Sequence, residues 1–252
     1  MVIHGLTNQV KFGMVIIGNN MPSSFKIKIP LTSLQPKQTF QDDLRNSTGQ
    51  MLAKYGNFFR AAAAGTNLPV QFLYAIAMVE TTGSHYYPSG AVNVSGSERS
   101  TGILQVSPSE FYEVVYKKEL PQGRLSQASL DILNKYLPSL PTDAKYSGTP
   151  SPAVLNRIFL ALKKPEFNIW AGAMVLRRLI EETANPDGTM RPDKAIIKYN
   201  VGDYSKPTKL DVFVNGDTTS LVKAVNSITS AYIVKVTGAN GGMDYYLKNQ
   251  IA

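Results

Sequence analysis

The spacing of hydrophobic residues changes along the chain and divides it into two regions. In residues 10–29 the apolar positions form two short runs, and at 26–29 polar and apolar side chains alternate as in a half-buried strand. Farther along, apolar residues recur three and four positions apart, which is the period of an amphipathic helix. We therefore expect a mainly α protein, with a β-like arm at residues 1–45 as a candidate docking element and a helical domain at residues 46–252.

Prolines and polar caps predict where several of these helices begin. Asn67 is a candidate N-cap, followed by Pro69 in the first turn of its helix. Ser107-Pro108-Ser109-Glu110 has the pattern of a capping box, and Asn168 is a candidate cap for a helix in which Gly172 permits close packing. Further helices are expected at about 130–137, inside an insertion at about 119–165, then at 192–202 and at 221–232, before a glycine-rich C-terminal stretch.

A single carboxylate, Glu80, continues the apolar face formed by Leu73, Ile76 and Ala77. Its side chain should therefore point toward apolar packing, and it also lies at the negative, C-terminal end of the helix dipole. Both effects disfavour the ionised form and raise the pKa of the carboxyl group. A carboxyl group that stays protonated near neutral pH is suited to general acid catalysis. The alternative is a partly exposed glutamate at a helix end, with no catalytic role.

The charge composition favours an anionic partner. A net charge of +8 and a pI near 9.5 suit a nucleic acid, a membrane surface or a bacterial wall polymer, although a basic protein without such a partner is also consistent with them. The sequence has no basic stripe interleaved with aromatic residues, so we predict no nucleic-acid partner. The apolar run at residues 12–18 is too short to span a membrane and is not a convincing signal-peptide core.

The composition also limits the chemistry that the chain can perform. With 43% hydrophobic residues, a chain of 252 residues can bury a substantial core. It contains no cysteine, which excludes disulfides and thiolate metal sites. Its two histidines, His4 and His85, do not complete a plausible metal-binding set, so we predict neither a metal nor a cofactor.

Four strings occur in an order that is typical of one enzyme family. These strings are AIAMVE, GILQVSP, NIWAGAMVLRRL and YNVG, and the similarity spans about residues 67–236. In this order they resemble the Slt-type lytic transglycosylases, whose small helical, lysozyme-like domain is shared with goose-type lysozymes. The resemblance implies that fold and an enzyme that cleaves the β-1,4 bond between N-acetylmuramic acid and N-acetylglucosamine in peptidoglycan, forming 1,6-anhydromuramic acid.

The resemblance also implies a role for each matched residue. Glu80 matches the catalytic glutamate of the family, although Thr81 stands where serine is usual. Gln105 matches the glutamine that lines the saccharide cleft, and Tyr199 and Asn200 match a Tyr-Asn pair placed near the acid and the sugar. The expected site therefore contains Glu80 as the catalytic residue and the other three matched residues as ligands of the substrate.

A reaction of this kind needs only one acid, because the substrate supplies the nucleophile. Glu110 is explained by its capping box, and we expect Glu98 to be solvated or paired with an arginine; Asp203, beside the YNVG string, is a weak candidate for a second acid. Two alternatives remain open. In the first alternative, the chain is a muramidase of the same fold, which uses water as the nucleophile. In the second, it is an inactive structural or wall-binding module.

The long loop after Glu80 holds further candidates. The interval from Glu80 to Gly102 is longer than is usual in the family, and its cleft-lining serine cannot be assigned. Aromatic residues near the expected cleft could stack on sugar rings or pack in the core. The candidates are Ser95, Ser97 and Ser100 for the serine, and Tyr86, Tyr87 and Tyr112 for sugar stacking.

The expected location follows from the absence of a clear export signal. Cellular enzymes of the resembled family normally carry a signal peptide or a lipid anchor, which this sequence does not show. We therefore expect a bacteriophage virion protein, carried in the tail or among the ejected proteins, that acts on the bacterial cell wall. The β-like arm at residues 1–45 would then contact phage tail or ejection proteins. An endolysin released through a holin is the alternative.

Overall fold

Helices make up most of the described chain. A computed structural model of the protein describes residues 32–83, 100–138, 149–184, 187, 190–201 and 227–249. Within those ranges, β-structure is limited to isolated bridges, so the prediction of a mainly α protein is confirmed. The helices are α1 (Gln38–Thr66), α2 (Val70–Thr81), α3 (Pro108–Phe111), the π-helix η2 (Tyr112–Glu119), α4 (Gln127–Tyr136), α5 (Pro152–Leu162), α6 (Pro165–Glu182), α7 (Pro192–Val201), α9 (Ser227–Thr237) and α10 (Gly242–Lys248).

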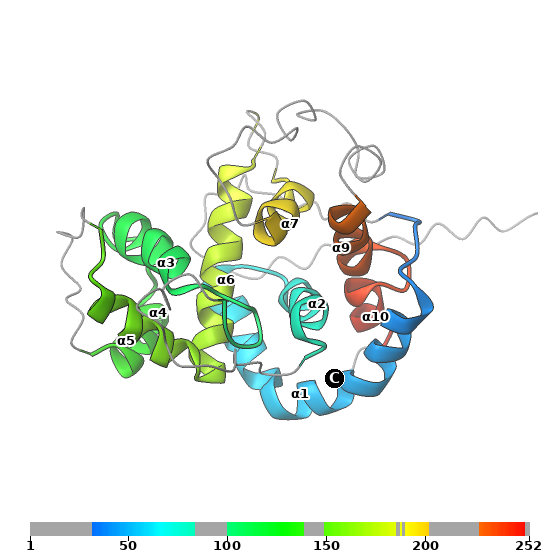
Figure 1. Cartoon of the computed structure of the whole chain (residues 1–252), viewed down its shortest axis with the longest axis horizontal. Coiled ribbons are helices and arrows are strands. Elements are labelled where there is room, and N and C mark those ends of the chain that lie inside the picture. The colour runs from blue at the N-terminus through cyan, green and yellow to red at the C-terminus, as the bar shows by residue number, and fades with distance from the viewer. Residues whose placement is uncertain are drawn as a thin grey trace, which may run out of the picture.

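The second helix, α2, lies in the middle of the molecule (Figure 1). Helices α1, α9 and α10 pack against it, and every residue from Phe72 to Met78 is buried. A helix that is apolar on all sides belongs in a core, so burial extends beyond the single face that we expected. The predicted cap is wrong, because Asn67 has a left-handed φ of 56° and ends α1, while α2 begins after Pro69.

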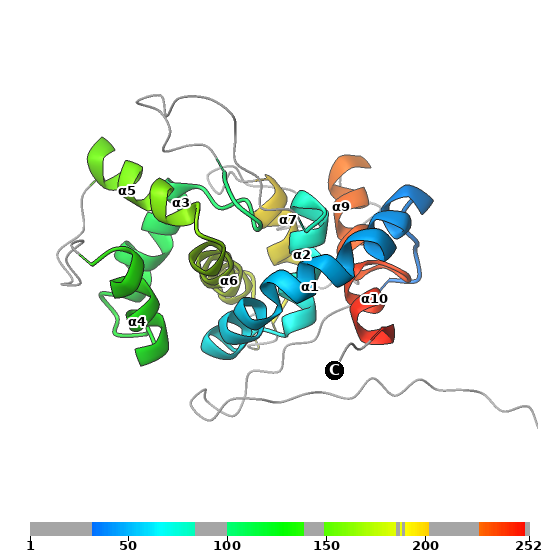
Figure 2. The same cartoon turned by 90° about the horizontal axis from the view of Figure 1, so that it is seen from below.

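The longest buried stretch belongs to α6, which is flanked by α1, α5 and α7 (Figure 2). Its first helical residue is Pro165, where the missing N–H leaves no intrahelical hydrogen bond unmade. Asn168 lies one turn farther on and is fully buried, so the prediction that it caps this helix is wrong. Its role is described below, with the residues that it contacts.

Helix α1 crosses the expected boundary between arm and domain at residue 45. Phe40 and Leu44 are both buried in the common core, so residues 38–45 belong to the helical body. The β-like runs of residues 10–29 lie outside the described residues.

The described part of the expected insertion also joins this core. Helix α4 confirms the short helix expected near residue 130, and both α4 and α5 pack on α6. Leu133, Ile158 and Leu162 belong to the same buried cluster as α2 and α6. Residues 119–165 therefore do not form a separate folding unit where the structure describes them.

The C-terminal end differs from the expected pattern. Helix α9 corresponds to the last helix that the sequence predicts, but α10 follows it in the glycine-rich stretch that was not expected to be helical. Met243 of α10 is buried, and the ring of Tyr246 lies 5.0 Å from that of Tyr74 in α2. Packing against α2 thus stabilises a helix too short to form alone.

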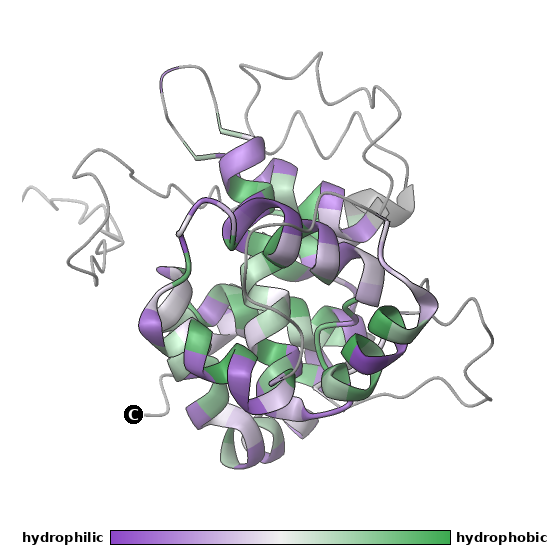
Figure 3. Cartoon of the chain, turned by 90° about the vertical axis from the view of Figure 1, so that its left-hand side faces the viewer, coloured by the Kyte–Doolittle hydropathy of each residue, from purple (hydrophilic) through white to green (hydrophobic). Residues whose placement is uncertain are grey.

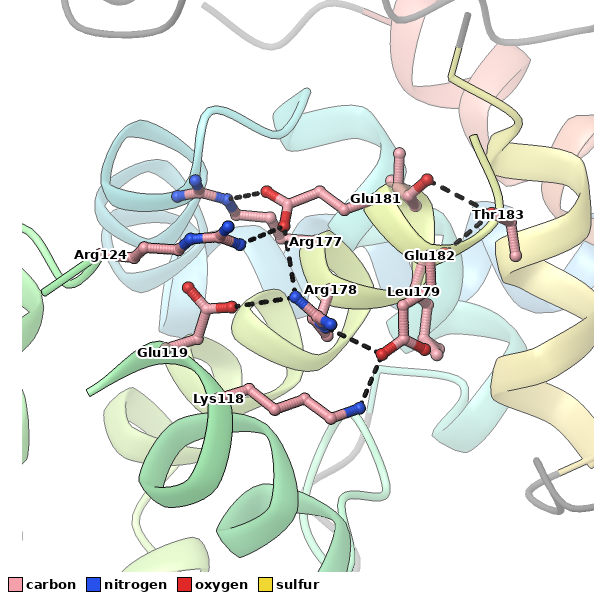
Figure 4. A network of polar contacts seen from close by, with 10 residues as sticks. Lys118, Glu119, Arg124, Arg177, Arg178, Leu179, Glu181, Glu182 and Thr183 are labelled. Atoms are coloured by element: carbon pink, nitrogen blue, oxygen red, sulfur yellow. Dashed lines mark hydrogen bonds and ion pairs between the residues drawn. The ribbon is translucent and has the colours of Figure 1, made fainter. Parts of the chain in front are cut away.

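A network of ion pairs joins the end of η2 to the end of α6 (Figure 4). Lys118 lies 2.7 Å from Glu182, and Arg124 lies 3.5 Å from Glu181. Glu119, the last residue of η2, is almost fully buried beneath this network. The network also includes Arg177 and Arg178 of α6, which pair with Glu181 and Glu182 at 3.0 and 2.8 Å.

The ribbon coloured by hydropathy is mostly green, or apolar, where the helices face each other, and purple, or polar, segments lie mainly on the outward faces (Figure 3). This separation is typical of a folded chain with one hydrophobic core. None of the described helices is both long enough and apolar enough to cross a bilayer.

Candidate active site

Glu80 lies in the last turn of the central helix α2, partly buried, with its carboxyl group next to α9. The hydroxyl group of Tyr232, in α9, donates a hydrogen bond to Glu80 Oε1 over 2.5 Å. The helix ends two residues later at Thr82, whose φ is 53° and whose N–H bonds to carbonyl oxygens of the preceding turn. The fold therefore holds this carboxyl group at the end of a rigid, buried element.

The surroundings of Glu80 favour its protonated form. Burial raises the pKa of Glu80, the hydrogen bond from Tyr232 partly opposes that rise, and the negative charge of Glu110 adds to it. The direction is the one predicted from the sequence. The Ser107 half of the expected capping box is present, since Ser107 Oγ accepts a hydrogen bond from the N–H of Glu110 over 3.2 Å. The charge of Glu110 nevertheless acts on Glu80.

The surroundings of Tyr232 favour its protonated form, in which the hydroxyl group is a hydrogen-bond donor. Its side chain is only 7% exposed, and burial raises the pKa of its hydroxyl group well above the ordinary value. The neighbouring charge of Glu80 raises it further. A neutral phenol beside a carboxyl group can stabilise the carboxylate once its proton has left.

A short hairpin at residues 101–106 faces the end of α2. Thr101 and Val106 exchange both backbone hydrogen bonds over 3.1 Å, and the four residues between them form the turn. Gln105 has a left-handed φ of 48°, and its Nε2 donates to the carbonyl oxygen of Gly102 over 2.6 Å. The turn therefore sets the direction of the Gln105 side chain.

Two neighbouring helices bind this hairpin through hydroxyl groups. Thr81 Oγ1, at the end of α2, shares its proton between the carbonyl oxygen of Ala77 at 3.1 Å and that of Ile103, in the hairpin, at 3.2 Å. The hydroxyl group of Tyr199, in α7, donates to the carbonyl oxygen of Leu104. These contacts bring residues from three distant stretches of the sequence to one place.

The structure brings together three of the four predicted site residues. Glu80 and Gln105 are linked by the contacts of Thr81 with the hairpin, and Tyr199 contacts the hairpin directly. Asn200 follows Tyr199 in α7 and is partly buried, but within the described residues it makes no hydrogen bond to the other three. Its predicted contact with substrate stays a prediction.

Tyr232 is a member of the candidate site that the sequence analysis did not identify. It was expected only as one apolar position of a helix. The available signal was weak, because a tyrosine on a buried face needs a partner for its hydroxyl group, but the sequence does not say which partner. The contact joins residues 152 positions apart.

Several other candidates do not belong to the described site. Tyr112 was a candidate for sugar stacking, but it is only 2% exposed, and its ring stacks on that of Tyr116 at 5.3 Å, so that candidate is wrong. Ser100 is exposed and is the only one of the three serines in the described ranges. The candidates outside those ranges are Tyr86, Tyr87, Ser95, Ser97, Glu98, Asp203 and both histidines.

The described residues contain no group of three or more histidine or acidic side chains arranged to hold a metal ion. No family model, curated protein or solved structure matches the chain. The function is therefore inferred from the chemistry of the site itself, together with the sequence resemblance described above.

Proposed function

We propose that the chain is a peptidoglycan lytic transglycosylase with a lysozyme-like helical fold, in which Glu80 acts first as the acid and then as the base. The observation that carries this proposal is the carboxyl group of Glu80, whose pKa is raised by burial and which accepts a hydrogen bond from Tyr232. This arrangement supplies a proton donor and stabilises the carboxylate that remains. The order of the four sequence strings supports the substrate class.

In the first step, protonated Glu80 gives its proton to the glycosidic oxygen between N-acetylmuramic acid and N-acetylglucosamine. The bond from C1 of the muramic acid to that oxygen breaks, and N-acetylglucosamine leaves with the proton. The 2-acetamido group of the substrate stabilises the positive charge that develops at C1. Tyr232 stabilises the Glu80 carboxylate through its hydrogen bond.

In the second step, the Glu80 carboxylate takes the proton from the C6 hydroxyl group of the same muramic acid. The C6 oxygen forms a bond to C1 and closes the 1,6-anhydro ring. Glu80 is protonated again at the end of the cycle, so no water is consumed and no second base is needed. We assign Gln105, Tyr199 and Asn200 to holding the sugar while both transfers occur.

Hydrolysis by a muramidase of the same fold is a second candidate, which one observation favours. The charge of Glu110 acts on Glu80, so a second carboxylate lies within electrostatic range of the proposed acid. Two carboxylates are the usual equipment of glycoside hydrolases, where the second one activates water or attacks the sugar. The products distinguish the two reactions, because hydrolysis leaves reducing ends.

The proposal extends to the setting of the enzyme. A net charge of +8 suits an anionic wall polymer, and a phage virion would bring the protein to that polymer. Contact with phage tail or ejection proteins is assigned to the arm, most of which lies in residues 1–31 outside the described ranges. An inactive module would bind the wall without cutting it.

The test is mass spectrometry of the muropeptides that the full chain and its Glu80→Gln variant release from purified peptidoglycan. We expect anhydromuramyl ends from the wild type and none from the variant. Reducing ends would instead establish the muramidase. Binding to the wall without release of fragments by either protein would leave only the binding module.

A further inference from the structure

A buried carboxamide joins the hairpin at residues 101–106 to α6. Asn168 is fully buried inside this helix, where a polar side chain is costly unless its donor and its acceptor both find partners. Its Oδ1 accepts a hydrogen bond from the N–H of Leu104 over 2.9 Å, and its Nδ2 donates to the carbonyl oxygen of Thr101 over 2.8 Å. One side chain thus binds both sides of the turn.

Two glycines allow the hairpin to approach α6 closely enough for these bonds. A Cβ on Gly102 would lie 2.2 Å from Asn168 Nδ2, and Gly102 also has a φ of 83°, which favours glycine. A Cβ on Gly172, one turn after Asn168, would lie 2.5 Å from Leu104 Cδ1. Both positions therefore require glycine, and both serve the same contact between hairpin and helix.

The four carbonyl oxygens of residues 101–104 all accept hydrogen bonds. The oxygen of Thr101 accepts from Asn168, and that of Gly102 accepts from Gln105. The remaining two carbonyl oxygens bind the hydroxyl groups of α2 and α7 described above. A non-glycine residue in the left-handed region is strained, and such a conformation persists where its surroundings fix it. Gln105 is in this position, and Asn168 supplies two of the bonds that fix the turn.

We propose that Asn168 is a positioning residue. By fixing the hairpin, it holds Gln105 and the hydroxyl group of Tyr199 at a set position relative to Glu80. The inference rests on the proposed function where the test measures enzymatic turnover. The contact between Asn168 and the hairpin can be tested without that function. Asn168 acts through the hairpin and touches no substrate. The contact requires a carboxamide, because the NH₂ group of the side chain has to donate while its carbonyl oxygen accepts.

The substitution Asn168→Asp gives a sharp test, because the two protonation states of an aspartate behave differently. The ionised carboxylate could accept from Leu104 N–H but could not donate to the carbonyl oxygen of Thr101. The protonated carboxyl group has the same shape as the carboxamide of asparagine and could make both bonds. The Asn168→Asp variant should therefore regain activity, relative to wild type at the same pH, as the pH is lowered.

The experiment compares Asn168→Ala, Asn168→Asp and a control, Ser129→Ala, in the full chain. Ser129 is also buried and accepts a hydrogen bond from Trp170 Nε1 of α6 over 3.1 Å, so the control loses a buried bond to the same helix but leaves the hairpin intact. We expect Asn168→Ala to lower kcat for release of anhydromuropeptides roughly tenfold to a hundredfold, as small misplacements of reacting groups do. The control should keep wild-type kcat.

Hydrogen exchange supplies a readout that does not depend on activity. The Leu104 amide should exchange at least about tenfold faster in Asn168→Ala than in wild type, while amides in the middle of α6 keep their protection. Wild-type exchange at Leu104 together with wild-type kcat would overturn the inference. Equal losses of kcat in the control and in Asn168→Ala would also overturn it. If wild type released no muropeptides, the proposed function would fail, and the exchange would still test the contact.

Discussion

Glu80, which is partly buried, and Glu119, which is almost fully buried, occupy opposite kinds of surroundings in this protein. Burial is the largest influence on both, and it raises the pKa of each carboxyl group. Glu80 is partly buried and accepts a hydrogen bond from a neutral phenol, with a second carboxylate nearby. Glu119 is only 2% exposed, neither of its oxygens has a hydrogen-bond partner among the described residues, and arginines surround it.

The difference lies in what happens when each group loses its proton. Arg178 lies 3.9 Å from Glu119, and the charges of Arg124 and Arg177 also lower the pKa of its carboxyl group against the effect of burial. No ion pair to Glu80 lies within the described ranges, so among those residues its carboxylate has the hydroxyl group of Tyr232 to stabilise it. A raised pKa therefore does not identify a catalytic acid. A single neutral donor at the end of a buried helix, beside a fixed hairpin, is the stronger indication.

The largest expected effect separates the two glutamates by activity. Glu80→Gln should lower the release of muropeptides by about 10³-fold, because general acid and base catalysis are both lost. Glu119→Gln should release them at the wild-type rate. The rates are measured with both variants matched for folded fraction by circular dichroism. A comparable loss in Glu119→Gln would show that the ion-pair network affects the site.

A smaller effect is expected when the neutral donor is removed. Tyr232→Phe should lower kcat roughly tenfold or more, the amount expected for a hydrogen bond to a charged group. The hydrogen bond lowers the pKa of Glu80, so its loss should raise that pKa. The fall of kcat/KM at high pH, where Glu80 loses its proton, should then move to higher pH in the variant. A pH profile identical to wild type would contradict the role given to Tyr232.

Glu110→Gln should move the same part of the profile in the opposite direction. The charge of Glu110 raises the pKa of Glu80, so its removal should lower that pKa and make activity fall at lower pH. For a transglycosylase, the change in kcat at the optimum should stay below about tenfold, since Glu110 takes no part in the proton transfers. Reducing-end products that the wild type makes and this variant does not would instead assign Glu110 to hydrolysis.

The smallest expected effect concerns stability. The folded-state pKa of Glu119 lies above its unfolded value, so the stability that its protonation contributes is present at low pH and is lost as the pH rises through the folded value. The free energy of unfolding of Glu119→Gln, minus that of wild type, should therefore increase as the pH rises from about 4 to about 7. Urea unfolding at the two pH values measures the change. A relative loss of stability would show that the arginines stabilise the carboxylate more than burial disfavours it.

The sequence predicted the helices best where proline or a serine cap marks the first turn. Pro192 begins α7, and Ser107 caps α3 as expected. Asparagine was misleading in both places where it was interpreted as a cap. Asn67 ends a helix in the left-handed conformation, and Asn168 uses both ends of its carboxamide inside one. The same short polar side chain serves all three purposes, and the local sequence does not distinguish them.

The candidate site was predictable only in part, because the sequence shows its local spacing but not its long-range contacts. The apolar spacing placed Glu80 at the end of a buried helix, and from that position the direction of its pKa shift follows. The partners of Glu80 and of the hairpin come from α6, α7 and α9, far along the chain, and the sequence contains no distances. Helix α10 was not predicted because only its packing on α2 makes its glycine-rich sequence helical.

The contact between Glu80 and Tyr232 also orders events in time. Tyr232 leaves the ribosome 152 residues after Glu80, which at ordinary rates of synthesis is a delay of roughly 8 to 30 seconds. During that delay the acid lacks its phenol and helix α9, which packs on α2, so the surroundings that shift its pKa are incomplete. A chain that ends before α9 therefore carries the proposed proton donor without its hydrogen-bond partner. Only a finished protein has the complete site.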